Sequence, residues 1–90
     1  MKELGHILPI SELLEGKSLD SDGSLTSQVY TLLKDLIITI QLYPGQMLSE
    51  KDVSEALQAS KTPVREAMIR LQTSGLVKII PKKGTFVTPI

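Results

Sequence analysis

The stretch SKTPVREAMIRLQTSG, residues 60–75, predicts one helix whose two ends are both marked in the sequence. Ser60 is a residue type that accepts a hydrogen bond from the free amides of a first helical turn. Pro63 falls within that first turn, where its missing N–H costs no bond inside the helix. Gly75 provides the left-handed residue that commonly closes a helix. We therefore expect one helix between Ser60 and Gly75.

This predicted helix has two different faces. Apolar side chains recur at steps of three and four residues, the spacing of one α-helical face, at Val64, Ala67, Met68 and Leu71. The residues that fall on other faces are Lys61, Thr62, Arg65 and Ile69. A first turn and a half that offers a hydroxyl, an ammonium and a guanidinium can enter a DNA major groove end-on. An ordinary amphipathic helix with a solvated face explains the same pattern, so the helix alone leaves both interpretations open.

Two further helices are predicted upstream. An apolar stripe at helical spacing runs through Leu25, Val29, Leu32, Leu33, Leu36, Ile37 and Ile40, with Ser24 or Thr26 as the cap. The turn signal at residues 43–45 predicts that this helix stops near Gln41 or Leu42. After a short extended piece at residues 47–48, Ser49 caps a second helix, and residues 58–59 turn the chain into Ser60.

After Gly75 the apolar period changes from 3.6 to 2. Residues 76–80 are predicted to form one strand, residues 81–84 a turn, and residues 85–88 the returning strand. We therefore predict a mainly α fold with a small antiparallel sheet, a winged helix-turn-helix of three helices plus a β-hairpin wing, over residues 25–90. Residues 1–24 are interpreted as a mobile tail and linker, in which residues 11–15 form one or two helical turns that end at Gly16.

The net charge of zero conceals a polarised distribution. Residues 1–60 carry nine acidic and four basic residues, whereas residues 61–90 carry one acidic and six basic residues. A phosphate backbone responds to the local field of one face, so the basic C-terminal third keeps a nucleic-acid partner possible.

The composition also excludes several classes of function. The chain has no cysteine and a single histidine, His6, and it has no Gly-rich phosphate loop, so we expect neither an enzyme nor a cofactor or metal site. Its longest apolar run, residues 36–40, is far too short to span a bilayer. We expect a soluble cytoplasmic protein without a membrane partner.

Several spaced motifs together resemble the N-terminal winged-helix domain of GntR-family bacterial transcription regulators, in the FadR-like (FCD) branch. The resemblance covers residues 25–90 and rests on YPGQMLSE at 43–50, SKTPVREA at 60–67, Leu71, GLV at 75–77 and KGTFV at 83–87. It implies a DNA-binding function. It also implies a metabolite-binding effector domain with the dimer interface, and these 90 residues contain no counterpart of that domain.

The resemblance implies particular contacts with DNA. Lys51 matches a basic residue early in the second helix, Ser60, Lys61 and Thr62 match a hydroxyl–arginine–threonine pattern, and Arg65 matches an arginine one turn on. Gly84 matches the wing-tip glycine near the minor groove. Lys51 and Lys61 stand where arginine is usual, and lysine offers a point charge rather than a planar fork for guanine.

We therefore expect sequence-specific binding to double-stranded DNA. The predicted site residues are Lys51, Ser60, Lys61, Thr62, Arg65, Lys82, Lys83 and Gly84. Arg70 is expected to be structural and paired with Glu66. The alternative function is a winged-helix module for protein–protein contact, favoured by the acidic first half and the apolar patch at residues 7–14. The fragment is expected to be monomeric or weakly associating.

Overall fold

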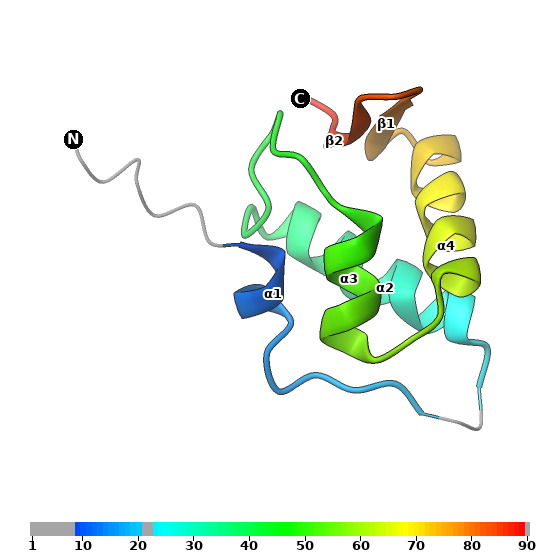
Figure 1. Cartoon of the computed structure of the whole chain (residues 1–90). Coiled ribbons are helices and arrows are strands. Elements are labelled where there is room, and N and C mark those ends of the chain that lie inside the picture. The colour runs from blue at the N-terminus through cyan, green and yellow to red at the C-terminus, as the bar shows by residue number, and fades with distance from the viewer. Residues whose placement is uncertain (1–8, 21–22, 90) are drawn as a thin grey trace.

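The computed structural model describes residues 9–20 and 23–89. Over these residues the chain forms four α-helices and a two-stranded antiparallel sheet (Figure 1). The elements run in the order α1 (Ile10–Leu13), α2 (Leu25–Ile38), α3 (Glu50–Leu57), α4 (Lys61–Thr73), β1 (Val77–Ile80) and β2 (Gly84–Val87). The predicted winged helix-turn-helix is confirmed, with the short α1 in addition to the three expected helices.

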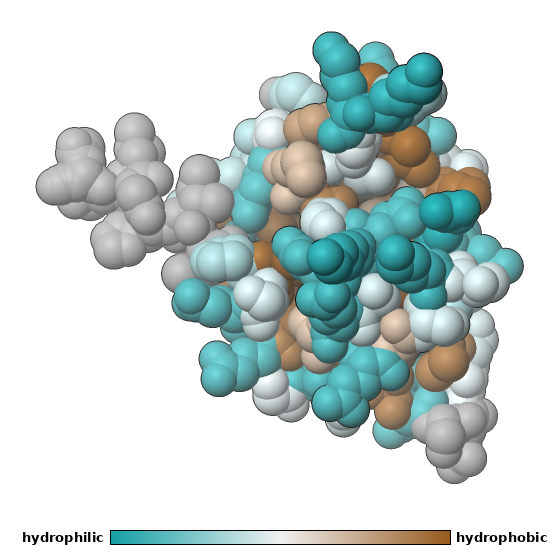
Figure 2. All heavy atoms as spheres, in the orientation of Figure 1, coloured by the Kyte–Doolittle hydropathy of each residue, from teal (hydrophilic) through white to brown (hydrophobic). Residues whose placement is uncertain are grey.

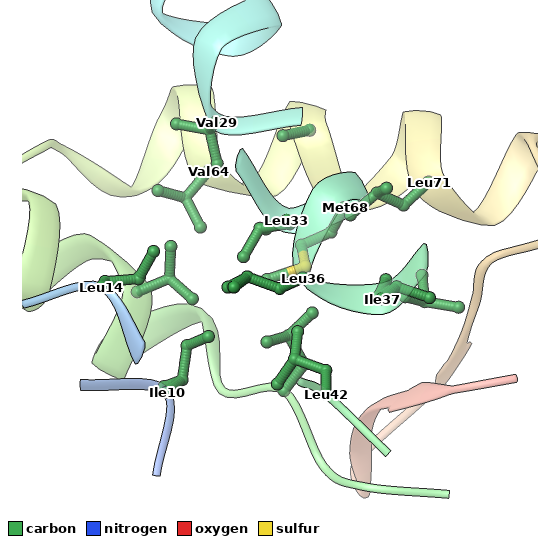
Figure 3. Close-up of a cluster of buried hydrophobic side chains, with 14 of the residues drawn as sticks. Ile10, Leu14, Val29, Leu33, Leu36, Ile37, Leu42, Val64, Met68 and Leu71 are labelled. Atoms are coloured by element: carbon green, nitrogen blue, oxygen red, sulfur yellow. The ribbon is translucent and has the colours of Figure 1, made fainter. Parts of the chain in front are cut away.

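The apolar face predicted for α4 lies in the centre of the core. Val64, Ala67, Met68 and Leu71 are all 0% exposed. Figure 3 shows side chains of α2 and α4 pointing into one cluster, with the sulfur of Met68 beside Leu36. Gly75 closes α4 with a φ of 80°, as predicted. Because α4 is held on this face, the side chains that fall on its other faces, Lys61, Thr62, Arg65 and Ile69, are exposed.

The predicted end of α2 is wrong by a few residues. The helix stops at Ile38, and Ile40 takes a left-handed φ of 61°. The amides of Gln41 and Leu42 then both donate to the carbonyl of Leu36, at 2.9 Å and 3.0 Å. Two residues assigned to the core stripe are in fact exposed, Leu25 to 38% and Ile40 to 42%, because Leu25 begins the helix and Ile40 lies beyond its end.

The hairpin is joined by a third extended segment. β1 pairs with β2 from Val77 opposite Val87 to Ile80 opposite Gly84. On the other side of β2, the amide of Leu48 donates to the Thr85 carbonyl at 2.7 Å, and the Val87 amide donates to the Gln46 carbonyl at 2.9 Å. The predicted extended piece after the turn therefore fixes the wing to the start of α3.

The N-terminal segment packs on the domain where the structure describes it. Helical turns were predicted over residues 11–15, and α1 occupies Ile10–Leu13, with Gly16 at a φ of 81°. Ile10 is 5% exposed and Leu14 is 0% exposed, and Figure 3 shows both pointing into the core. The apolar patch predicted at residues 7–14 as a surface for protein–protein contact is therefore wrong for these two residues, which are buried. His6 and Ile7 lie outside the described residues.

Polar contacts fix the angle between α2 and α4, and they differ from the predicted Arg70–Glu66 pair. Arg70 Nη1 donates to Ser27 Oγ at 3.1 Å, and its guanidinium lies 4.6 Å from the centre of the Tyr30 ring. Glu66 Oε1 instead accepts from Thr26 Oγ1 at 2.8 Å. Each of these two side chains has its partner on the neighbouring helix, at least 40 positions away in the sequence, and spacing along one helix cannot reveal such a contact.

Among the helices that the structure describes, none has the length and apolar character that crossing a membrane requires.

Candidate nucleic-acid interface

The helices α2, α3 and α4 each begin after a serine, but the three serines behave differently. Ser24 Oγ accepts from the Ser27 amide, and Ser49 Oγ accepts from the Asp52 amide, both at 3.2 Å. Ser60 makes no such bond, so the predicted capping bond is absent. In all three helices the capping donor would be the third helical residue, and in α4 that residue is Pro63, which has no N–H. The Ser60 hydroxyl is exposed and uncommitted to its own helix.

The start of α4 gathers three of the predicted site residues around one hollow. Lys61, Thr62 and Arg65 line it together with Glu66 and Ile69, and its volume is about 340 Å³. We call these five residues the α4 hollow. Glu66 and Ile69 were not predicted as site residues, and Ile69 is 49% exposed although it is apolar. The α4 hollow combines an ammonium, a hydroxyl, a guanidinium, a carboxylate and an apolar side chain on one exposed surface.

Arg65 is joined to the neighbouring helix by an ion pair. Its Nε lies 3.4 Å from Oε1 of Glu50, the first residue of α3, and the two side chains are 67% and 26% exposed. This is the one ion pair within residues 9–20 and 23–89. Glu50 was not predicted as a functional residue, because no spacing rule connects residues 15 positions apart on two helices. Lys51 follows Glu50 on α3 and is exposed.

The wing tip, residues 81–84, presents the other predicted basic residues. The Lys83 amide donates to the Ile80 carbonyl at 3.0 Å and closes a turn in which Lys82 takes a left-handed φ of 68°. Both lysines are exposed. Gly84 has a φ of 131°, and a Cβ there would lie 3.5 Å from Met47 Sδ, an ordinary contact. Backbone conformation, rather than lack of space, is therefore what requires glycine at this position.

A second hollow connects the wing to α3. Its volume is about 220 Å³, and its lining residues are Met47, Leu48, Ser49, Glu50, Gly84 and Thr85. Glu50 thus lies between Gly84 of the wing and Arg65 of α4. Figure 2 shows hydrophilic side chains gathered on one face over α3 and α4 and at the hairpin. The structure therefore joins the α4 hollow and the wing tip into a single surface through Glu50.

The predicted site residues are all accessible except Gly84, which is half-buried. Six of them are exposed side chains that carry a positive charge or a hydroxyl: Lys51, Ser60, Lys61, Thr62, Lys82 and Lys83. Arg65 is also exposed, and it differs from these by its ion pair. No group of three or more potential metal-ligating side chains occurs within the described residues.

Comparison with known proteins identifies relatives of this chain. Residues 25–87 match the model of a family described as bacterial regulatory proteins, gntR family. The HTH-type transcriptional repressor RspR of Escherichia coli strain K12 is 41% identical over 72 residues, which make up 80% of this chain and 32% of RspR. The chain spans between 26% and 45% of the length of the first curated relatives it matches.

Solved structures show the same fold. A transcriptional regulator from Pseudomonas syringae, described as a GntR family member, superposes with a TM-score of 0.78 at 26% identity, over 90% of this chain and 34% of that chain. The AraR(DBD) solved in complex with operator ORE1 superposes with a TM-score of 0.69 at 25% identity. The latter match covers 78% of this chain and 89% of the AraR chain.

Proposed function

Because this chain belongs to the gntR family of bacterial regulatory proteins, we propose that it binds double-stranded DNA with sequence specificity. The N-terminal end of α4 enters the major groove, and the wing tip lies at the minor groove. The relatives named as HTH-type transcriptional regulators and the AraR complex with its operator support this proposal.

One observation carries the proposal. Lys61, Thr62 and Arg65 surround one hollow at the start of α4, while Val64, Ala67 and Met68 anchor the opposite face of the same turns in the core. A helix that is anchored in this way presents its polar side chains in fixed register, which reading of base edges requires. An ordinary amphipathic helix with a solvated face gives no reason for a lysine, a threonine and an arginine to surround one hollow.

The site residues divide into two roles. Arg65, Lys61 and Thr62 read base edges in the major groove, since they lie at the start of the anchored helix. Exposed lysines outside the α4 hollow contact phosphates, which position the protein without reading the sequence. We assign this second role to Lys51, Lys82 and Lys83, with the Ser60 hydroxyl as an additional phosphate or base contact.

In this proposal a protein that carries this domain acts as a transcription regulator. The string TPVREA, residues 62–67, supports assignment to the FadR-like branch of the family. A dimer of full-length chains then presents two α4 helices to symmetric half-sites, as dimeric helix-turn-helix proteins do.

Selection of bound sequences from a random DNA pool tests the proposal. The expected result is one enriched motif, which footprinting then places on a natural promoter. An Arg65→Ala variant is the control, and we expect it to lose preference at one or two base positions of that motif by roughly 5- to 160-fold, the range for a bidentate contact. A pool that shows no enriched motif contradicts sequence-specific binding.

A protein–protein contact module is the second candidate function. It is favoured by exposed apolar side chains, above all Ile38 at 57%, beside a groove of about 420 Å³ lined by Ile37, Ile38, Gly75, Leu76, Thr88 and Pro89. The burial of Ile10 and Leu14 removes part of the apolar surface that had favoured this function. Salt separates the two candidates, because DNA binding weakens steeply with ionic strength, whereas an apolar interface changes little.

A further inference from the structure

We propose that Glu50 is a positioning residue that fixes the direction in which Arg65 reads DNA, an inference that rests on the proposed function. The starting observation is the contact between Glu50 Oε1 and Arg65 Nε at 3.4 Å. It joins the first residue of α3 to the fifth residue of α4. Within residues 9–20 and 23–89 no other carboxylate pairs with Arg65, and its neighbour Glu66 is turned to α2, where it accepts from Thr26.

The planar shape of the guanidinium determines which donors of Arg65 this contact occupies and which it leaves available. Arginine carries five N–H donors in one plane, and only the Nε edge faces Glu50. The Nη donors at the outer edge stay available, and a parallel pair of them matches the O6 and N7 acceptors of guanine. A carboxylate at Nε therefore selects, among the rotamers of a long side chain, those that point the reading edge away from α3.

Stability does not explain the pair. Arg65 is 67% exposed, and ion pairs with a solvent-exposed partner contribute little to folding. A carboxylate in a surface that faces DNA phosphates also carries an electrostatic cost. We therefore expect Glu50 to weaken binding to DNA of any sequence and to increase the discrimination between sequences.

These opposing effects predict a distinctive result for Glu50→Ala. Affinity for random duplex DNA increases, because one negative charge leaves the interface. Base preference decreases, because Arg65 is no longer held in one orientation. Loss of a merely structural residue would instead lower the affinity for all sequences together.

Asp52→Ala provides a matched control. Asp52 is the other acidic residue in the first turn of α3, and its side chain is exposed, so both variants lose one charge next to the same helix N-terminus. Asp52→Ala should increase affinity for random DNA to a similar extent and leave the selected motif unchanged. Glu50→Gln keeps an acceptor oxygen for Arg65 Nε, and it should restore most of the base preference without restoring the charge.

The experiment selects DNA from a random pool with the 90-residue chain and with the Arg65→Ala, Glu50→Ala, Glu50→Gln and Asp52→Ala variants, after thermal melting confirms that each folds. Arg65→Ala identifies the base position that Arg65 reads. We expect Glu50→Ala to weaken preference at that same position by about two- to tenfold, the low end of the coupling between residues in contact. A Glu50→Ala, Arg65→Ala double variant should show the same base preferences as Arg65→Ala alone.

The possible results distinguish a failure of the role proposed for Glu50 from a failure of the proposed DNA-binding function. If the Glu50→Ala variant selects the same motif as the wild-type chain, the role proposed for Glu50 is wrong. The role is also wrong if Asp52→Ala weakens the motif as much as Glu50→Ala does. Either result leaves the proposed DNA binding intact. A wild-type chain that enriches no motif overturns the proposed function and this inference together.

Discussion

Three residues close helices in this chain by taking a left-handed conformation, and they are chemically very different. Gly75 closes α4, Gln58 closes α3 and Ile40 closes α2, with φ values of 80°, 54° and 61°. The bonding is alike in all three, since the next amide donates to a carbonyl five positions back: Leu76 to Leu71, Ala59 to Ser54 and Gln41 to Leu36. Only Ile40 is β-branched, which makes it the most strained of the three.

Gly75→Ala should therefore destabilise the protein, whereas Ile40→Gly should change its stability little. Glycine at position 40 removes the left-handed strain, but Ile40 is only 42% exposed, so the substitution also removes buried apolar surface and adds freedom to the unfolded chain. We expect these effects to offset one another to within about 1 kcal/mol, measured by urea denaturation. Gly75→Ala gains no such relief, and it should lower the free energy of unfolding by about 1–2 kcal/mol. A larger decrease for Ile40→Gly than for Gly75→Ala would show that packing of the Ile40 side chain outweighs its backbone strain.

The helix α1 and the wing make separate contributions, α1 to folding and the wing to binding. α1 is only four residues long, yet it delivers Ile10 and Leu14 into the core against α3. The wing is fixed at its base by residues 45–48 and presents Lys82 and Lys83 at its tip. Changes in α1 should thus affect folding, whereas changes at the wing tip should affect binding.

Leu14→Ala tests the contribution of α1 to folding. Leu14 is 0% exposed, and truncation of a fully buried leucine costs about 2–5 kcal/mol. We expect a loss of that size in urea denaturation with a single cooperative transition. Ser11→Ala, at an exposed position on the same helix, should change stability by less than about 0.5 kcal/mol. If Leu14→Ala melts like the wild-type chain, then α1 is a detachable segment.

Lys83→Ala tests the contribution of the wing to binding. Its exposed ammonium at a turn tip suits a phosphate contact better than a base edge. We expect affinity to decrease alike for all DNA sequences, and the slope of log K against log salt to become shallower by about one unit. Loss of discrimination at an unchanged slope would assign Lys83 to base reading instead.

Capping residues, turn residues and apolar periodicity predicted most of these elements, but they did not predict the contacts between elements. The cap at Ser49, the closing Gly75 and the buried face of α4 follow from residue type and spacing within a single helix. The end of α2 was missed because Ile40 carries no sign of a helix terminator. The Glu50–Arg65 pair, the contact of Arg70 with Tyr30 and the docking of α1 depend on how helices pack, which periodicity along one helix does not encode.

At the scale of the whole molecule, one core takes most of the apolar side chains. Six large hydrophobic residues are exposed among those described: Leu25, Ile38, Ile40, Tyr43, Met47 and Ile69. A stable protein–protein interface buries about 800 Å² of each partner, which is roughly a seventh of the 5738 Å² of accessible surface of this chain.

We therefore expect these 90 residues to be mainly monomeric at micromolar concentration in analytical ultracentrifugation. Their affinity for DNA should lie nearer the non-specific range of about 10⁻⁴–10⁻⁶ M than the specific range. Fusion to a dimerising domain should restore tight binding to palindromic sites through effective concentration. A stable dimer of the 90 residues would contradict this expectation and point to the groove beside Ile38 and Leu76 as the interface.

The polarised charge of the molecule makes salt the most direct probe of the central claim, that α4 and the wing form a sequence-specific DNA surface. The measurement is the equilibrium affinity of the chain for the selected duplex and for a scrambled duplex at several salt concentrations. We predict that log K falls linearly with log salt. At roughly −0.9 per neutralised phosphate, the slope should lie between about −2.7, for the three lysines assigned to phosphates, and about −4.5, the limit if Lys61 and Arg65 also neutralise phosphates. The selected duplex should bind more tightly than the scrambled duplex at every concentration. An affinity that does not change with salt, or that is equal for the two duplexes, would contradict the claim.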